Sequence, residues 1–256
     1  MTILKIDNLT HWFGGLRAVA DFSIDLPEGA LWAIIGPNGA GKTTVFNLIT
    51  GVYRPTQGSV VFEGRQLVGQ PTHKIIAGGI ARTFQNIRLF RELSVLDNIR
   101  IANYAQVKSS PLASLLTLPS FQREEIEIRD RSLEFLSIFG LESLYDVPAH
   151  NLPYGQQRRL EIARALATGP RLLLLDEPAA GMNPGEILQL IDLILMVRQR
   201  FNLTILLIEH QMRVVMGIAE RIKVLDFGQT IAEGTPQEIQ NNPRVIEAYL
   251  GEEDKA

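Results

Sequence analysis

Apolar and polar residues alternate along the first part of the chain. Phe22, Ile24 and Leu26 are separated by single polar residues. Side chains of a β-strand point alternately to its two faces, so this spacing predicts a strand with one buried face. The turn sequence PEG follows at residues 27–29, and the apolar run ALWAII at residues 30–35 then predicts a buried strand.

Two apolar runs in the second half of the chain have the composition of buried strands. They are RLLLLDEP at residues 171–178 and LTILLIE at residues 203–209, and the sequence between them predicts a helix over residues 185–200. Continuous apolar strands that alternate with helices indicate an α/β fold with a mainly parallel sheet covered on both faces. Residues 222–234 predict a hairpin, and Thr235 then begins a helix with a capping box.

The middle of the chain has helical periodicity from about residue 87 to residue 166. Ser94 and Asp97 resemble a capping box that opens one helix. Apolar residues at helical spacing predict a second helix over residues 123–139, which ends at Gly140. We therefore expect a helical subdomain at about residues 87–166, inserted into a core of about residues 1–86 and 167–256.

The segment SSPLASLLTLPSF at residues 109–121 is apolar for a connection between two helices. Connections normally run over the protein surface, where their backbone groups stay in contact with water. The segment therefore either packs locally or is covered by a partner. The sequence leaves both alternatives open, with a neighbouring helix or a membrane protein as the contact.

Composition narrows the class of protein but not its activity. The chain has 256 residues, of which 46% are hydrophobic and 21% charged, as in ordinary soluble domains. No apolar run reaches the roughly 18–20 residues of a spanning helix, and the N-terminal sequence has no secretory signal. The lack of cysteine excludes disulfides, and a net charge of −3 gives no general attraction to nucleic acid. A cytoplasmic location is the expectation.

A glycine-rich segment lies between the strand predicted at residues 30–35 and a predicted helix that ends near Gly51. It matches the P-loop pattern, in which glycines let consecutive backbone N–H groups surround a phosphate. Lys42 would neutralise β- and γ-phosphate oxygens, and the Thr43 hydroxyl would coordinate Mg²⁺. The predicted cofactors are ATP and Mg²⁺, and the nucleotide-binding residues are Gly36, Pro37, Asn38, Gly39, Ala40, Gly41, Lys42, Thr43 and Thr44.

The apolar strand predicted at residues 171–178 ends in two adjacent carboxylates. In P-loop enzymes a buried strand that ends in a carboxylate helps to hold Mg²⁺, which is the role predicted for Asp176. Glu177, immediately after it, would polarise an attacking water. An apolar strand that ends in Asp-Glu is usually structural when it occurs alone, but its pairing with a P-loop favours the catalytic interpretation.

The sequence LPYGQQRRLEIARALA at residues 152–167 resembles the start of a phosphate-binding helix with unusual first residues. Pro153 has no N–H group, and the bulky Tyr154 precedes the one glycine, Gly155. This segment is a phosphate site, the remnant of one, or an ordinary helix. These residues alone do not decide among the three.

Five motifs resemble those of the ATP-binding subunits of ABC transporters and occur in the same order. They are Gly36–Thr43, Arg82–Gln85, Leu152–Gln156, Asp176–Pro178 and His210. The resemblance extends from Leu9 to Gly251. The forms QRRLEIARAL and DEPAAGMNP further resemble the ATPases of branched-chain amino acid importers. The resemblance implies a P-loop core with a mainly parallel sheet, an antiparallel β portion and an inserted α-helical subdomain.

The resemblance also implies roles for residues outside the P-loop. Gln85 would sense Mg²⁺ or water and relay the nucleotide state to the membrane subunits. His210 would contact the γ-phosphate and hold the attacking water together with Glu177, although an isolated histidine after a strand is more often just a polar strand end. Phe13 would stack on adenine, with ordinary packing as the alternative role and Trp12 as a competing candidate.

In this family the segment corresponding to Leu152–Gln156 usually reads LSGGQ and closes over ATP bound by the partner subunit. Pro153 removes the serine hydroxyl, but the N–H groups of Tyr154 and Gly155 and the positive end of the helix dipole remain. We therefore expect an active but altered phosphate site at Tyr154, Gly155 and Gln156.

Three other residues bear on this phosphate site: Asn183, Arg158 and Arg159. Asn183 stands where many relatives carry aspartate, so the carboxylate contact across the dimer is in doubt, although the amide can still form hydrogen bonds. Arg158 and Arg159 could reach phosphate, but solvated or intrachain-paired roles are favoured for both.

The expected activity is ATP hydrolysis that powers a membrane importer, most simply for branched-chain or other hydrophobic amino acids. Expected partners are a second ATPase subunit, identical or related and arranged head to tail, separate membrane permeases and, indirectly, a substrate-binding protein, with no nucleic acid. The location would be the cytoplasmic face of the membrane. The alternatives are an ABC ATPase for urea, amides or other amino acids, a soluble ABC ATPase, and a non-hydrolysing ATP-binding module.

Overall fold

The structure is a computed structural model that describes residues 1–103 and 119–253. These residues form two compact units, one made of Met1–Gln85 with the chain from Arg171 onward, and the other of Asn86–Pro170. Most of the apolar segment at residues 109–121, namely residues 109–118, lies outside the described part of the chain.

The first unit is built on a six-stranded sheet with the strand order β10-β9-β3-β8-β7-β6. Its strands are β3 (Leu31–Ile35), β6 (Ile80–Arg82), β7 (Leu172–Asp176), β8 (Thr204–Ile208), β9 (Arg221–Asp226) and β10 (Gln229–Gly234). Neighbours from β9 to β6 are parallel, and only β10 runs antiparallel to its neighbour. The mainly parallel sheet and the terminal hairpin predicted from the sequence are confirmed.

A second, antiparallel sheet with the order β2-β1-β4-β5 belongs to the same unit. Its strands are β1 (Thr2–Phe13), β2 (Leu16–Pro27), β4 (Gln57–Phe62) and β5 (Arg65–Gln66). The predicted strand around Phe22–Leu26 is part of β2, whereas β1 was not predicted. Register shifts between Ile6 and Leu9 break the alternation of β1, so its period-two signal is weak.

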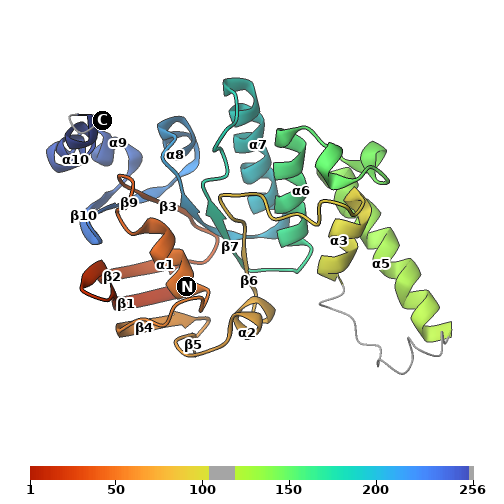
Figure 1. Cartoon of the computed structure of the whole chain (residues 1–256), viewed down its shortest axis with the longest axis horizontal. Coiled ribbons are helices and arrows are strands. Elements are labelled where there is room, and N and C mark those ends of the chain that lie inside the picture. Colours follow the sequence, from red (N-terminus) through yellow and green to blue (C-terminus); the bar gives the residue numbers. More distant parts are fainter. Residues whose placement is uncertain (104–118, 254–256) are drawn as a thin grey trace. The chain divides into compact units, whose positions relative to one another are not determined.

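Helix α1 (Lys42–Ile49) packs between the two sheets, as Figure 1 shows. Its Val45, Phe46 and Ile49 belong to one hydrophobic cluster with residues of both sheets, such as Leu4 of β1 and Leu206 of β8. The remaining helices of this unit are α2 (Thr72–Ala77), α7 (Pro184–Phe201), α8 (Met212–Ile218), α9 (Pro236–Gln240) and α10 (Pro243–Glu253). Because α1 follows the P-loop directly, the core fixes that loop at the sheet.

Helices α7 and α9 begin as their sequences require. The Asn183 side chain accepts hydrogen bonds from the backbone N–H groups of Gly185 and Glu186, and the Glu186 carboxylate accepts one from the Asn183 N–H, which completes the capping box. Thr235 and Glu238 form the corresponding box of α9, which confirms the prediction for that helix. The side-chain oxygen of Asn183 is therefore already engaged in starting α7.

The second unit is helical, with α3 (Val95–Asn103), α5 (Pro119–Ile138) and α6 (Tyr154–Leu166), and two short 3₁₀ turns, Glu142–Leu144 and Ala149–Asn151, lie between α5 and α6. Ser94 Oγ accepts a hydrogen bond from the Asp97 N–H at 3.0 Å, which confirms the predicted cap of α3. Gly140 has a φ of 65° and follows α5, as expected for a helix terminator.

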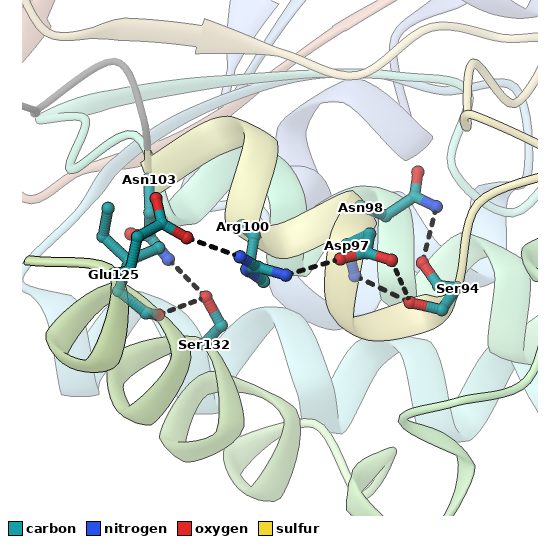
Figure 2. Close-up of polar contacts among 8 residues, drawn as sticks. Ser94, Asp97, Asn98, Arg100, Asn103, Glu125 and Ser132 are labelled. Carbon is teal, nitrogen blue, oxygen red and sulfur yellow. Dashed lines mark hydrogen bonds and ion pairs between the residues drawn. The ribbon is translucent and has the colours of Figure 1, made fainter. Parts of the chain in front are cut away.

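Figure 2 shows the polar side chains that connect α3 to α5 within this unit. Arg100 donates hydrogen bonds to Asp97 of its own helix at 3.0 Å and to Glu125 of α5 at 2.7 Å. Deeper in the contact, Asn103 donates to the hydroxyl of the fully buried Ser132. These hydrogen bonds connect polar side chains of the two helices across their contact, so α3 and α5 form one packed pair.

Among the described residues, no helix combines the length and the apolar character that are needed to cross a membrane.

The β9–β10 hairpin contains a largely buried cation, Lys223, opposite Glu233. Glu233 accepts hydrogen bonds from Lys223 and, at 2.9 Å, from Arg221 Nε. Burial raises the pKa of the Glu233 carboxyl, but the hydrogen bonds and positive charges of Lys223 and Arg221 outweigh burial and hold that pKa below its ordinary value. A depressed pKa means that the folded state prefers the charged carboxylate.

We predict that Glu233→Gln lowers the free energy of unfolding by about 1–3 kcal/mol at neutral pH, because it leaves the Lys223 ammonium poorly paired. Since the folded-state pKa is depressed, this contribution is present above the unfolded pKa and is lost as pH falls through the folded pKa. Denaturant titrations from pH 7 to pH 3 should therefore show the two proteins converging in acid. The double variant Glu233→Gln with Lys223→Met is the control and should recover much of the loss, and a pH-independent difference would contradict the prediction.

Candidate nucleotide-binding site

The glycine-rich loop connects the carboxyl end of β3 to the start of α1, and two of its glycines lie against other backbone segments. Gly36 has a φ of 150°, and a Cβ there would lie 2.0 Å from the Leu225 carbonyl oxygen. A Cβ on Gly41, with a φ of 98°, would lie 2.4 Å from the Ala18 carbonyl oxygen. Neither position has room for a side chain, so the loop follows a path that only glycine allows.

The ammonium group of Lys42 folds back onto the first residues of the loop. Lys42 Nζ donates hydrogen bonds to the carbonyl oxygens of Gly36 at 2.7 Å and Pro37 at 2.8 Å, and the residue is only 6% exposed. Lys42 is also the first residue of α1, whose N-terminus carries partial positive charge. Ammonium, loop N–H groups and helix dipole therefore all favour a polyphosphate.

A pocket of about 440 Å³ opens beside this loop. It is lined by Phe13, Leu16, Arg17, Ala18, Asn38, Gly39, Ala40, Gly41, Lys42, Thr43, Thr44, Gln85, Glu177, Phe227 and Gly228. Of the residues predicted for the site from the sequence, Phe13, most of the P-loop, Gln85 and Glu177 thus lie around one pocket.

Phe13 borders this pocket at the end of β1, and it is 43% exposed. Its ring makes edge contacts with the rings of His11 and Tyr53, with centroids 4.6 and 5.2 Å apart. Trp12, the competing candidate, is not among the lining residues and instead lies beneath the guanidinium of Arg17. Of the two aromatic residues, Phe13 is the one that a nucleotide in this pocket could reach.

Gln85, Glu177 and His210 meet at the carboxyl edge of the parallel sheet. Gln85 Nε2 donates a hydrogen bond of 2.7 Å to Glu177 Oε2, and His210 Nδ1 lies 3.7 Å from the same oxygen. Glu177 is buried and adopts a φ of 46°, a left-handed conformation that is unusual for a residue other than glycine. Strain of this kind is retained mainly where function requires a fixed geometry.

Glu209 is a buried carboxylate that the sequence analysis missed. It is fully buried at the end of β8, where Oε1 accepts from the Ala179 N–H and Oε2 accepts from the N–H groups of His210 and Gln211. One side chain thereby fixes both the turn that carries His210 and the loop that follows Glu177. The signal available in the sequence was an acidic residue at the end of an apolar strand, next to the predicted histidine.

Asp176 forms a buried ion pair with Arg82. Like Glu209, Arg82 had no role of its own in the prediction from the sequence. Arg82 Nη2 lies 2.7 Å from Asp176 Oδ2, with the two side chains 6% and 2% exposed. Arg82 also donates a 2.7 Å hydrogen bond to Asn47 of α1, and its guanidinium lies over the rings of Phe46 and Phe84. Strands β6 and β7 and helix α1 are therefore joined through one guanidinium.

The donors available for a divalent cation fit Mg²⁺ bound together with a nucleotide. Oδ1 of Asp176 is buried and has no hydrogen-bond partner within the described part of the chain. Within the same part, no group of three or more His, Cys, Asp or Glu side chains could hold a metal by itself. Mg²⁺ characteristically takes one or two protein oxygens and completes its shell with phosphates and water, so Thr43, Gln85 and Asp176 are suitable candidates.

Tyr154, Gly155 and Gln156 form the first turn of α6 and belong to the unit Asn86–Pro170, whereas the pocket belongs to the other unit. Pro153 is the N-terminal cap residue and supplies no side-chain hydrogen bond. Its carbonyl accepts from the Gln156 N–H at 3.0 Å. The substitution of proline for serine thus leaves a regular helix start without a hydroxyl.

Arg158 of α6 is fully buried and forms a 2.6 Å ion pair with Glu161. It also donates a 3.3 Å hydrogen bond to the Tyr154 hydroxyl, while Glu161 accepts from the Arg88 N–H. The intrachain pairing favoured for Arg158 is confirmed, but the side chain is buried rather than solvated. It fixes Tyr154 from within the helix.

A mainly parallel sheet, a glycine-rich loop after β3 and carboxylates at the ends of neighbouring strands define a P-loop nucleotide-binding protein. The profile of the ABC transporter family matches residues 19–180, and that of the branched-chain amino acid ATP-binding cassette transporters matches residues 229–255. The chain therefore belongs to the ABC transporter family of ATP-binding cassettes, which are ATPases.

Individual relatives agree with this assignment. The chain is 50% identical, over 98% of both chains, to the high-affinity branched-chain amino acid transport ATP-binding protein LivG of Salmonella typhimurium. It resembles the ADP conformation of an ABC-transporter cassette with a TM-score of 0.85 and 34% identity, over 98% of this chain and 99% of the other. A dimeric, ADP- and phosphate-bound cassette is similar with a TM-score of 0.76 and 25% identity, over 91% and 98%.

We predict that Arg82→Ala lowers the free energy of unfolding by about 3–5 kcal/mol, because Asp176 would remain buried without its cation. Denaturant unfolding of the nucleotide-free chain measures this loss. The control is Arg171→Ala, since Arg171 also pairs with glutamates but is 54% exposed and should cost at most about 1 kcal/mol. Equal losses of unfolding free energy for the two variants would contradict the prediction, because they would show that burial does not increase the cost of removing the arginine.

Proposed function

We propose that this chain binds and hydrolyses ATP to power a membrane importer, with branched-chain or other hydrophobic amino acids as the cargo. The observation that carries the catalytic part is the convergence of Lys42, Gln85 and Glu177 on one pocket, with His210 3.7 Å from Glu177. The cargo is supported by the similarity to LivG and by the matching C-terminal profile.

The polyphosphate would lie in the P-loop, where Lys42 and the N–H groups of residues 38–44 neutralise its oxygens. Glu177 would orient a water and accept its proton as the water attacks the γ-phosphorus and the bond to the β,γ-bridging oxygen breaks, releasing ADP. Gln85 donates a hydrogen bond to Oε2 of this carboxylate and His210 lies beside the same oxygen, so the two residues would fix its direction. Thr43, Asp176 and Gln85 would hold Mg²⁺, which neutralises phosphate charge when it is bound.

Phe13 would stack on the adenine base from the end of β1. The first turn of α6, with Tyr154, Gly155 and Gln156, would direct its N–H groups and the positive end of its helix dipole at the γ-phosphate of the ATP that a second subunit binds. This proposal assigns each ATP to residues of two chains in head-to-tail order. The dimeric cassette among the similar structures supports the association of two cassettes. The second subunit would be identical or related.

The transporter context adds further partners. Cassettes of this family work with transmembrane permeases, and we propose that this chain binds separate permease subunits at the cytoplasmic face of the membrane through its helical subdomain, about residues 87–166. A substrate-binding protein would take part only indirectly, and no nucleic acid is involved. Urea, amides or other amino acids as cargo constitute the second candidate function, because the cassette itself does not contact cargo.

The catalytic proposal predicts that Glu177→Gln reduces steady-state ATP hydrolysis by at least about 10²-fold while ATP binding persists, because the amide cannot accept a proton. Lys42→Ala should instead weaken ATP binding. Phosphate release and equilibrium ATP binding, measured on the same preparations, separate the two effects. Glu142→Gln, at a surface glutamate of the second unit, is the control and should leave both quantities unchanged.

The same Glu177→Gln chain should dimerise with ATP and separate without it, as measured by light scattering. Turnover of Glu177→Gln at the parental rate would contradict the assigned base. Two results together would favour a non-hydrolysing module. The variant would bind ATP without pairing with a second cassette, even when the permease subunits are present, and the parent chain would not hydrolyse ATP.

The transport proposal predicts that the chain, purified under native conditions from membranes, carries permease subunits with it. In vesicles that contain this complex and its binding protein, uptake of leucine should require ATP and should stop with Glu177→Gln. Purification of the chain from its native source without any membrane subunit would contradict the transport role. Uptake of urea or another amino acid without leucine uptake would instead favour the second candidate function.

A further inference from the structure

Phe227 occupies an unfavourable position at the turn of the β9–β10 hairpin. The side chain is 80% exposed, and the backbone has a φ of 42°. Two-residue hairpin turns with positive φ strongly favour Asn, Asp and Gly, and a bulky aromatic residue in this conformation is an outlier. The next residue, Gly228, has a φ of 79° and fits such a turn. Phenylalanine therefore incurs both backbone strain and an exposed apolar ring here.

The backbone around Phe227 is held firmly against the nucleotide-binding loop. The Gly228 N–H donates a 3.0 Å hydrogen bond to the Ala40 carbonyl, and the Gly228 carbonyl accepts from the Ala20 N–H at 2.8 Å. A Cβ on Gly228 would lie 2.7 Å from the Ala18 carbonyl oxygen. The turn is thus packed between the P-loop and β2, and the ring of Phe227 projects from a fixed base.

Phe227 lines the same pocket as two other exposed apolar side chains, Phe13 and Leu16. It also borders a second hollow of about 560 Å³ next to α10, so its ring belongs to the wall shared by the two spaces. The polar end of the pocket, with Lys42 and the loop N–H groups, suits phosphates. The apolar residues Phe13, Leu16 and Phe227 therefore suit the uncharged part of a nucleotide, its base and ribose.

We infer that Phe227 packs against the nucleoside part of bound ATP and, together with Phe13, determines the affinity for the nucleotide. This inference deepens the proposed function and rests on it. Contact with a base or ribose covers an aromatic ring that is otherwise exposed, which gives a reason for phenylalanine at a turn that favours Asn or Gly. A triphosphate without a nucleoside cannot make this contact.

The test compares ATP with inorganic tripolyphosphate as ligands of the full-length chain, by calorimetry. Phe227→Ala should weaken ATP binding about 3- to 30-fold, as expected for the loss of one partly covered aromatic ring, and should leave tripolyphosphate binding unchanged. Phe227→Asn, which suits the positive φ, should show the same selective loss with unreduced thermal stability. Phe227→Tyr keeps the ring and should retain ATP affinity. Leu188→Ala, at an exposed apolar residue of α7, is the control and should change neither ligand.

Each result bears on the inference. A selective loss of ATP affinity in both Phe227→Ala and Phe227→Asn supports it. Unchanged ATP affinity, or an equal loss for both ligands, overturns it while ATP binding by the parent chain still supports the proposed function. A loss that occurs only in ATP-dependent dimerisation would show that the ring contacts a second subunit, which also overturns it. Failure of the parent chain to bind ATP would overturn the proposed function and this inference together.

Discussion

The buried ion pair between Arg82 and Asp176 connects the parts of the site more directly than any other contact described above. The guanidinium spans the ends of β6 and β7, reaches Asn47 of α1 and lies against two aromatic rings, while both charged side chains are almost completely buried. A buried ion pair of this kind is not a strong source of net stability, because desolvation offsets much of the attraction. The pair instead fixes geometry. Separating the two side chains would leave a buried charge without its partner, so the ends of β6 and β7 and helix α1 are held in their relative positions. The strand that leads to Gln85 and the strand that ends at Asp176 are thereby held to the same helix as Lys42.

Parallel strands explain why the remaining groups meet. In a parallel sheet all carboxyl ends lie at one edge, so residues that are far apart in the chain but follow neighbouring strands become neighbours in space. Glu177 follows β7 and His210 follows β8, and β7 and β8 are adjacent. Glu209 then fixes both loops through three backbone N–H groups. A carboxylate that accepts three such bonds replaces the water that the backbone would otherwise bind, and it thereby holds both loops in place at the carboxyl edge of the sheet.

Much of this arrangement was predictable because its signals are local. Glycines at fixed spacing, an apolar run followed by Asp176-Glu177 and the capping residues Ser94 and Thr235 each act within one element, so the sequence reports them directly. The ion pair of Arg82, the three bonds of Glu209 and the position of Phe227 beside the pocket depend on which strands become neighbours. That information appears only when the strand order is known. Strand β1 was missed for a local reason, since its bulges break the alternation that identifies a strand.

The contacts of its side chains within the helix explain the unusual start of α6. Serine would offer a hydroxyl at position 153, and glycine at position 154 would leave the first turn open. Proline instead fixes the backbone entering the helix, and Tyr154 is bound through its hydroxyl to the buried Arg158, which Glu161 neutralises. The same Glu161 accepts the N–H of Arg88, three residues after Gln85 in the chain. A degenerate helix start would have no need for a buried cation to fix its first side chain, because a charge placed at 0% exposure is costly unless its partners are held in place. The pair therefore maintains the shape of this helix terminus. Under the proposed function, the backbone N–H groups of the first turn would contact phosphate without the help of a hydroxyl.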